Sequence, residues 1–388
     1  MKIARRFFAL LMVVFAPLLL LSSVGTHEKP SAKGQYLAYV GTYTTKTNSK
    51  GIYAFHYDAS TGLLSPIGVA AETPDPSFLA IHPSGKYLYA VNEAGKNSMV
   101  SAFALDAHSG KLTPLNQLPA LGDDPCYISF DKTGKYVFVA NYTSGNIAVF
   151  PIGPDGRLRE HTALVTDSGT TGPNKERQEG PHAHWIETSP DNRFVLVADL
   201  GLDEVLLYKF DAVNGSLTAN APAFAKLKPG SGPRHIAFHP NGNFVFVASE
   251  LSSTATAFRY DAKKGSLKEI GSISTLPSNF SGRNDVAELA VHPNGKFLYV
   301  SNRGYDSIAI LSIDGSTGAL TPIGGTPTGG KEPRHFAIDP TGKYLLAENQ
   351  LSDSILAFKI NPASGGLTQA ALEVSVPSPV DVAFVGAH

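Results

Sequence analysis

Residues 236–247 read IAFHPNGNFVFV, and this short stretch decides the fold class of the chain. Two apolar runs flank a turn in which Pro240 and Gly242 suit a tight reversal. The pattern predicts two short antiparallel strands. It returns as FAIDPTGKYLL at residues 336–346, and helical periodicity is absent along the chain. We therefore expect an all-β protein.

A second hairpin signature alternates with the first. An apolar run ends in Asp or an equivalent residue, and a few residues later come Gly, one further residue and Leu. The glycines of this signature are Gly62, Gly110, Gly156, Gly215, Gly265, Gly318 and Gly365. Their spacing of roughly 50 residues leaves room for about four short strands per repeat, which is typical of propeller blades. The sequence thus predicts a seven-bladed β-propeller with four-stranded blades.

The two ends of the repeat region are incomplete in complementary ways. The first repeat begins at a second strand, residues 36–41, and the chain ends with an isolated first strand, residues 379–385. We expect these strands to pair within one blade, because pairing hides two exposed edges. Residues 36–388 then form a single propeller domain.

The first residues have the pattern of a targeting segment. Three basic residues precede an apolar run at residues 7–21, and small residues follow it. This order is typical of a signal peptide, which we expect to span residues 1–25, with a flexible lead-in at residues 26–35. We predict an exported protein, periplasmic or extracellular, with no stable membrane insertion after cleavage. An uncleaved anchor is the alternative, although a spanning helix needs about 20 apolar residues.

The composition excludes several classes of protein and site. Lys and Arg number 32 against 33 Asp and Glu, so the net charge of −1 offers no field toward nucleic acid. With 43% hydrophobic and 17% charged residues, the chain is not disordered. Cys126 is the only cysteine, which excludes an internal disulfide framework and cysteine-based metal sites. No phosphate-cradling or dinucleotide-binding glycine motif is present, so we expect no cofactor.

The repeat also predicts which face of the propeller carries chemistry. Each innermost strand starts, and each second strand ends, near the central channel on the same face. The innermost strands start at Ser77, Cys126, His184, Arg234, Ala287, Arg334 and Val380. The residues that follow these are Phe78, Tyr127, Trp185, His235, Glu288, His335 and Asp381. The second strands end at Thr42, Glu93, Tyr142, Leu200, Glu250, Arg303 and Gln350. Histidines, arginines and carboxylates gather at these positions, so we expect the functional site at this mouth of the channel.

His182 and His184 form an H-x-H pattern, which in a strand directs both imidazoles the same way. Such a pair suits a metal, but no third His or Cys partner is evident, so we expect imidazole chemistry and no metal. A polar lining of the channel is the structural alternative.

Arg234 and Arg334 recur in Pro-Arg-His motifs of two separate blades. A guanidinium matches carboxylates and phosphates, and a buried arginine that holds a loop is the alternative. Glu250 is predicted to neighbour Arg234, either as its partner in a partly solvated ion pair or as a base that activates water. Arg303 likewise either recognises an anionic group or is a buried arginine with a structural role.

Further residues at the predicted mouth are candidates for binding substrate: Arg334, His335, His235, Glu288 and Glu93. Glu187 breaks a column of small residues in the innermost strands and is a weaker candidate. His82, His239 and His292 precede turns on the opposite face, and we expect them to be structural.

The sequence resembles the seven-bladed propeller lactonase family, which includes bacterial 6-phosphogluconolactonases of the propeller type and fungal carboxy-muconate cyclases. The resemblance covers nearly all of residues 36–385. Its most specific segments are GPHAH at 180–184, VADLG at 197–201, GPRH at 232–235, SEL at 249–251, AEL at 287–289, SNRG at 301–304 and PRHF at 333–336. It implies an active site of one His, two Arg and one Glu, which match His182 or His184, Arg234, Arg303 and Glu250. Those phosphogluconolactone enzymes work in the cytoplasm, so the signal peptide weakens the implication of a phosphorylated substrate.

We therefore predict a monomeric, metal-independent lactone hydrolase that acts on a small-molecule lactone. Glu250 or a channel histidine would take the proton of water, and the arginines would stabilise the oxyanion or hold an anionic group of the substrate. A lactonising cyclase of the muconate type and a propeller that only binds a ligand or protein are the alternatives. Turnover of simple sugar lactones separates them, because a cyclase should ignore saturated sugar lactones and a binding module should not turn them over.

Overall fold

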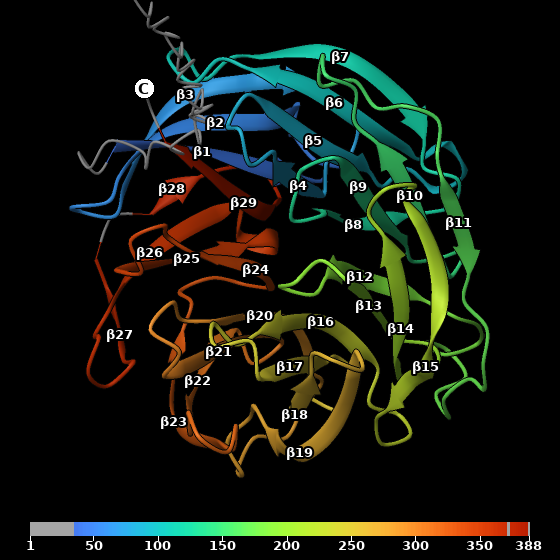
Figure 1. Cartoon of the computed structure of the whole chain (residues 1–388). Coiled ribbons are helices and arrows are strands. Elements are labelled where there is room, and N and C mark those ends of the chain that lie inside the picture. Colours follow the sequence, from blue (N-terminus) through green and yellow to red (C-terminus); the bar gives the residue numbers. More distant parts are fainter. Residues whose placement is uncertain (1–34, 371–372, 387–388) are drawn as a thin grey trace, which may run out of the picture. The chain divides into compact units, whose positions relative to one another are not determined.

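The computed structural model describes residues 35–370 and 373–386, and within them seven antiparallel sheets surround a common axis (Figure 1). The predicted all-β fold with seven four-stranded blades is confirmed. The expected signal peptide, and the lead-in as far as residue 34, lie outside the described residues. Gln35, the last residue of that predicted lead-in, already belongs to the first strand.

The strands occupy four successive positions from the axis outward. The innermost strands are β29 (Pro379–Gly386), β4 (Phe78–Ile81), β8 (Pro125–Phe130), β12 (Ala183–Thr188), β16 (Pro233–Phe238), β20 (Asp285–Val291) and β24 (Pro333–Ile338). The second strands are β1 (Gln35–Thr42), β5 (Tyr87–Asn92), β9 (Tyr136–Asn141), β13 (Phe194–Asp199), β17 (Phe244–Ser249), β21 (Phe297–Arg303) and β25 (Tyr344–Asn349).

The outer half of each blade continues the same antiparallel order. The third strands are β2 (Gly51–Asp58), β6 (Met99–Leu105), β10 (Asn146–Pro151), β14 (Glu204–Asp211), β18 (Thr254–Asp261), β22 (Ser307–Ile313) and β26 (Ser354–Ile360). The outermost strands are β3 (Leu63–Glu72), β7 (Leu112–Pro119), β11 (Ala163–Thr166), β15 (Ser216–Lys226), β19 (Ser266–Ser274), β23 (Leu320–Pro327), and the pair β27 (Leu367–Gln369) and β28 (Val374–Ser375).

The ring is closed by the two ends of the described chain. β29 pairs with β1 in antiparallel register, with Tyr36 opposite Gly386 and Val40 opposite Val382. The predicted closure is therefore confirmed, and both strands lose an open edge.

The hydrophobic core is divided into layers between neighbouring blades. The second strands are buried on both faces, as in β17, where every residue from Phe244 to Ser249 is inaccessible to solvent. In one layer, Phe246 of β17 and Leu298 of β21 belong to the same cluster. Because each second strand packs against two other blades, it is a continuous apolar run with no alternation of polar residues.

The turn histidines join adjacent blades. The Nε2 atoms of His82, His239 and His292 lie 2.8 Å from backbone oxygens in the corresponding turn of the next blade, at Gly134, Gly295 and Gly342. The structural role predicted for these histidines is thus confirmed.

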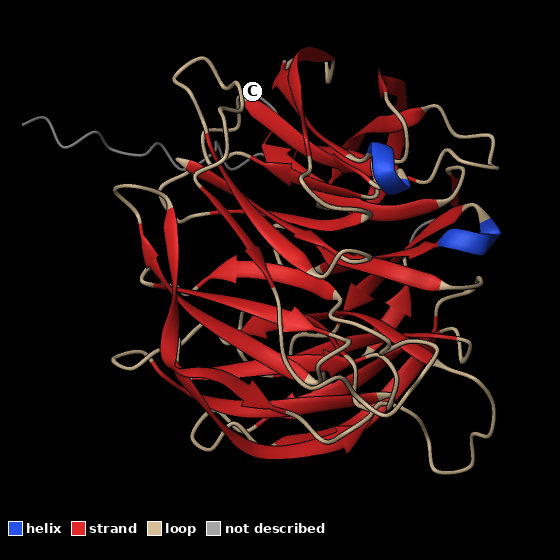
Figure 2. Ribbon diagram, turned by 90° about the vertical axis from the view of Figure 1, so that its right-hand side faces the viewer, coloured by secondary structure: helices blue, strands red, loops and turns tan. Residues whose placement is uncertain are grey.

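Six innermost strands have a β-bulge where they enter the sheet. The register against the second strand shifts at Cys126, His184, Arg234, Ala287–Glu288, Arg334 and Val380. A bulge sets two residues opposite one and redirects their side chains. Figure 2 shows the 3-10 helices η1 (Gly95–Asn97) and η2 (Gln350–Ser352) on one side of the propeller, where second strands end. Among the described residues, no helix is long and apolar enough to cross a membrane.

Candidate functional site

A small cavity lies on the propeller axis at the level where the innermost strands begin. It offers about 10 Å³ to the centre of a water molecule, which is roughly the space that one water needs. Its lining residues are Ser77, Phe78, Cys126, Arg234, His235, Arg334, His335 and Val380. All of them come from the two sets of entry positions expected from the sequence, so these positions do converge.

The bulges explain why consecutive residues reach the same cavity. In a regular strand, Arg234 and His235 would point to opposite faces. The register of β16 against β17 instead shifts between Pro233 and His235, which leaves Arg234 as the extra residue. Arg334 and His335 of β24 repeat this arrangement. A pair of adjacent side chains from one strand therefore lines the channel.

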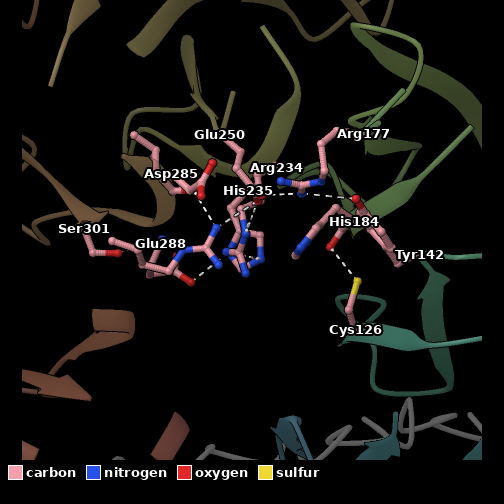
Figure 3. A network of polar contacts seen from close by, with 12 residues as sticks. Cys126, Tyr142, Arg177, His184, Arg234, His235, Glu250, Asp285, Glu288 and Ser301 are labelled. Atoms are coloured by element: carbon pink, nitrogen blue, oxygen red, sulfur yellow. Dashed lines mark hydrogen bonds and ion pairs between the residues drawn. The ribbon is translucent and has the colours of Figure 1, made fainter. Parts of the chain in front are cut away.

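Glu250, directly after β17, holds three arginines at the mouth (Figure 3). Its Oε1 lies 2.5 Å from Nη2 of Arg177, and its Oε2 lies 3.0 Å from Nε of Arg234 and 3.1 Å from Nη2 of Arg303. The Arg234 and Glu250 side chains are only 3% and 4% exposed. The contact between them is an ion pair without hydrogen-bond geometry, because Nε of Arg234 has no hydrogen-bond partner in the structure.

The arginines keep Glu250 ionised. Burial alone would raise the pKa of this carboxyl, but Arg303, Arg234, His184 and Arg177 outweigh burial and hold the pKa of Glu250 well below its usual range. Burial and the nearby Arg303 and Arg334 lower the pKa of Arg234 to about 10, so Arg234 stays charged at neutral pH. A carboxylate surrounded by three guanidinium groups is a poor proton acceptor.

Arg177 was not expected from the sequence. It lies in the long connection between β11 and β12, and it also contacts the Tyr142 hydroxyl at 3.3 Å. The one available signal was the unusually long interval between Gly156 and Gly215, which indicates an insertion at this blade.

His184 is a neutral histidine of the site. Burial and then Arg234 lower the pKa of its imidazole well below the ordinary value, so the ring carries no charge at neutral pH. Its Nδ1 is buried without a hydrogen-bond partner. The ring is edge-on to Tyr142 and His235, at 5.5 and 5.1 Å between ring centroids. Figure 3 shows it beside Arg177 and Tyr142.

His182 has a different environment. Its ring stacks on Tyr142 with centroids 4.5 Å apart and planes 14° apart. Nδ1 lies 3.0 Å from the Tyr142 carbonyl oxygen, and Nε2 lies 3.2 Å from Oε1 of Glu179. Both ring nitrogens are thus occupied. Both imidazoles thus lie against Tyr142, with His182 stacked on its ring and His184 edge-on to it, and the strand register shifts at His184.

Arg334 and Glu93 form a second polar group beside the cavity. The guanidinium of Arg334 lies over the Tyr43 ring at 5.4 Å from its centroid, and the Tyr43 hydroxyl donates to Oε2 of Glu93 at 2.7 Å. Burial raises the pKa of Glu93, although Arg334 opposes this. An open hollow adjoins this group and is lined by Tyr43, Thr45, Glu93, Gln350 and Ser378, among others.

The other predicted carboxylate, Glu288, lies between two histidines. Its Oε2 is 2.8 Å from Nδ1 of His235 and 3.4 Å from Nε2 of His335. Nδ1 of His335 is 2.7 Å from Oε2 of Glu348, a residue not expected at the site. The sequence does distinguish this residue. Glu348 occupies the position in β25 at which β9, β13 and β17 have alanine, namely Ala140, Ala198 and Ala248.

Aromatic rings from several blades pack together at the level of these histidines. Phe78 of β4 contacts Tyr127, His235 and His335, with ring centroids 4.3, 6.0 and 5.7 Å away. These partners belong to three other blades, so the Phe78 ring lies across the axis. Glu187 is not brought into the site, because it forms a 2.7 Å ion pair with Lys132 in the turn after β8. Within the described residues, no group of three or more His, Cys, Asp or Glu side chains is placed to hold a metal ion.

The chain matches the family model described as "Lactonase, 7-bladed beta-propeller" over residues 37–384. It is 38% identical over 301 residues to a protein of Bacillus subtilis (strain 168) named 6-phosphogluconolactonase, which covers 77% of this chain and 84% of the relative.

Solved structures agree with this similarity. The periplasmic gluconolactonase of Pseudomonas aeruginosa is 33% identical, with a TM-score of 0.86 over 91% of this chain and 100% of that one. A crystal structure from Bacteroides fragilis NCTC 9343 is 39% identical, with a TM-score of 0.85 over 92% of this chain and 100% of that one.

Proposed function

Since this chain belongs to the seven-bladed β-propeller lactonase family and is a lactone hydrolase, we propose that it opens a sugar lactone, or a related carboxylated lactone, at the channel mouth by attack of water. One observation carries the proposal: the neutral His184 lies beside the arginines that Glu250 holds, and its ring is 5.1 Å from that of His235, which lines the cavity with room for about one water. Ester hydrolysis needs a proton acceptor and a cationic group at such a position.

His184 is the proton acceptor for the attacking water in this proposal. It is neutral, and its unpartnered Nδ1 can accept a proton without breaking an existing hydrogen bond. His182 is less suited, because both of its ring nitrogens have partners. Glu250 is a positioning residue, since a carboxylate bound to three arginines has little affinity for a proton.

Arg234 and Arg303 stabilise the oxyanion that forms on the carbonyl oxygen. They point to the same carboxylate from different blades, so their cationic groups are fixed before substrate arrives. Preorganised charge of this kind stabilises a transition state without reorganisation and is commonly a large contribution to hydrolysis.

The charges at the mouth favour an anionic or oxygen-rich substrate. Four arginines there (Arg177, Arg234, Arg303 and Arg334) face the two carboxylates of Glu250 and Glu93. We propose that Arg334 and Glu93, with His235, His335 and Glu288 at the cavity floor, contact the substrate. The adjoining hollow presents hydroxyl and amide groups suited to sugar hydroxyls. A phosphate on the substrate suits the arginines, but a neutral sugar lactone whose product is a carboxylate suits them as well.

Purified protein tests the proposal directly. We expect hydrolysis of glucono-δ-lactone, 6-phosphogluconolactone or both above the spontaneous rate, measured as acid release in a pH-stat. The ratio of kcat/KM for the two substrates reports whether phosphate is recognised. Binding of these lactones without turnover would contradict the proposal and favour a binding propeller, while turnover of an unsaturated diacid alone would favour a cyclase.

We also propose that residues 36–388 act as an exported, monomeric domain released after cleavage near Gly25. The basic and apolar pattern at the start of the sequence supports export, and the name of the Pseudomonas relative includes a periplasmic location. N-terminal sequencing of the native protein should find a start close to residue 26, and light scattering should give the mass of one chain. A cytoplasmic protein that retains Lys2 would contradict the export proposal.

A further inference from the structure

The floor of the cavity contains ionisable side chains to which the mechanism above gives no proton-transfer role. His335 of β24 is surrounded by carboxyl groups from three other strands: Glu348 of β25, Glu288 of β20 and Asp381 of β29. Nδ1 of His335 is 2.7 Å from Oε2 of Glu348. Nε2 lies 3.4 Å from Oε2 of Glu288 and 3.3 Å from Oδ1 of Asp381.

These contacts fix the direction of the His335 ring. The short bond to Glu348 engages Nδ1, and a carboxylate behind an imidazole holds the ring in one orientation. Nε2 therefore faces the axis, and within the described part of the chain its contacts are ion pairs and none is a hydrogen bond. Because His335 also lines the one-water cavity with Arg234 and Arg334, Nε2 is the ring atom left to meet a bound molecule.

His235 lines the same cavity, but it has no ring nitrogen left to meet a bound molecule. Its Nδ1 is 2.8 Å from Glu288, and its Nε2 is 3.3 Å from Nη1 of Arg234. Since a guanidinium only donates, Nε2 of His235 is an acceptor and Nδ1 carries the proton. That proton is already shared with Glu288.

Opening of a lactone requires a second proton transfer, because the ring oxygen leaves as an alkoxide. Given the lactonase function proposed above, we propose that His335 is the general acid that protonates this oxygen, and that Glu348 positions it. Water gives a proton to His184 and forms a bond to the carbonyl carbon. The carbon–oxygen ring bond then breaks, its electron pair stays on the ring oxygen, and that oxygen takes the proton from Nε2 of His335. The carbonyl re-forms and gives a hydroxycarboxylic acid, which loses its proton and becomes the hydroxycarboxylate. Of this proton and the one on His184, one is released to solvent and the other replaces the proton that His335 gave up.

The neighbouring carboxyl groups can return a proton to His335. Burial, only partly opposed by His335, raises the pKa of Glu288 and of Asp381 to about 7. Burial also raises the pKa of Glu348 well above its usual value. These groups therefore share protons near neutral pH, and the cluster titrates as a unit. The other ionisable groups that face it are His235 and Arg234 of β16, Arg334 of β24 and the Tyr127 hydroxyl of β8.

The two histidines then have opposite surroundings, as an acid and a base require. His184 lies beside arginines that disfavour its charged form, whereas His335 lies among carboxyl groups that can supply protons. β12 and β24 are well separated in the order of blades, so the two rings come from different sides of the channel, with His335 in the cavity lining and His184 next to His235.

The pH dependence of kcat tests the assignment with glucono-δ-lactone, after subtraction of the spontaneous reaction. In the wild-type protein, kcat should fall on the alkaline side as the cluster loses its protons. His335→Gln should lower kcat about 10²-fold, change KM by less than about threefold, and abolish the alkaline fall. Glu348→Gln, which preserves the shape of the side chain, should lower kcat about 10-fold and move the alkaline fall toward lower pH, since an amide can neither supply a proton to the cluster nor ionise at alkaline pH to favour the protonated ring.

Glu187→Gln is the matched control, because it removes an inner-strand carboxyl that pairs with Lys132 away from the cavity. It should leave kcat and the pH profile unchanged. An unaltered alkaline fall in His335→Gln, or a loss confined to KM, would overturn the role of His335 as an acid. If His335→Gln does not fold, Glu348→Gln serves as the test. An unshifted pH profile of kcat in Glu348→Gln would also overturn the role of His335 as an acid. A wild-type protein without any lactone turnover would instead refute the proposed function itself.

Discussion

Glu250 is the residue on which the arrangement of the arginines depends, since its carboxylate lies within 3.1 Å of Arg177, Arg234 and Arg303. From the sequence, the Arg234–Glu250 pair was expected to be partly solvated. That expectation was wrong, because both side chains are almost fully buried. Removing one partner leaves an uncompensated buried charge.

We therefore expect Glu250→Gln and Arg234→Ala to affect both activity and stability. Turnover should fall about 10²-fold or more, because the oxyanion loses its preorganised charge. The free energy of unfolding should fall by about 3–5 kcal/mol, as is usual for breaking a buried pair. Urea unfolding and turnover per folded molecule measure the two effects. If a variant is destabilised but its turnover per folded molecule is unchanged, the pair has a structural role only.

His184 and His182 differ enough in their contacts to give a clear comparison. His184→Gln should lower kcat by about 10²-fold, because the water loses its proton acceptor. His182→Gln should lower the melting temperature, since both ring nitrogens have partners, and should affect kcat much less. Because the pKa of His184 is lowered, the wild-type enzyme should remain active below the ordinary pKa of histidine, 6.5. Equal losses of kcat in the two variants would contradict the assignment.

At the scale of elements, a pair of buried carboxyl groups joins the blade of β10 and β11 to that of β13 and β14. Asp167, after β11, lies close to Asp199 at the end of β13 and accepts from the Tyr208 hydroxyl of β14 at 3.1 Å. Asp199 accepts from the backbone nitrogens of His182 and Leu202 at 2.9 Å each. Oδ2 of each carboxyl is buried without a hydrogen-bond partner, and burial raises the pKa of both groups, so we expect the pair to share a proton.

This pair predicts a loss of stability at alkaline pH. Burial and then Asp199 raise the pKa of Asp167 well above its ordinary value, so the folded protein binds a proton that the unfolded chain releases above about pH 3.8. Its contribution is complete below that value and is lost as the pH rises through the raised pKa. Asp167→Asn keeps the donor and should melt at a higher temperature than wild type at alkaline pH, with little difference at pH 5.

Asp167→Ala is the control for this comparison. It leaves Asp199 and the Tyr208 hydroxyl without their partner, so it should be destabilised at every pH. Identical pH dependence of melting in wild type and Asp167→Asn would refute the shared proton.

The elements differ in how far the sequence could predict them. Turns such as Pro240–Gly242 and apolar runs such as Phe244–Val247 depend on local chemistry, so the strands and their order were predictable. The bulge at Arg234 depends on pairing with β17, which no local pattern encodes. Arg177 has no counterpart in other repeats, and the three-carboxyl environment of His335 exists only once the blades close into a ring. The convergence of the entry residues could thus be predicted, but the partners of each residue could not.

At the scale of the whole molecule, the ring depends on β29. Deleting residues from Pro379 onward removes the innermost strand of the closing blade and leaves the edge of β1 open. It also removes Asp381, whose Oδ2 accepts from the backbone nitrogen of Leu79 at 2.8 Å. We expect the truncated protein to aggregate or to lose its cooperative transition in thermal melting. Melting as sharp and as high as that of the full chain would contradict closure by this strand.

The Phe78 ring across the axis has a consequence for how substrate enters the site and how product leaves it. The ring packs against Tyr127, His235 and His335 of three other blades, on the side of the proposed site away from the arginines of the mouth. In the proposed mechanism, the hydroxycarboxylate leaves past the arginines that bound the lactone, and its negative charge favours binding to them. Product should therefore compete with substrate for this site. The turnover rate at high conversion should then depend on how fast these arginines release the anionic product.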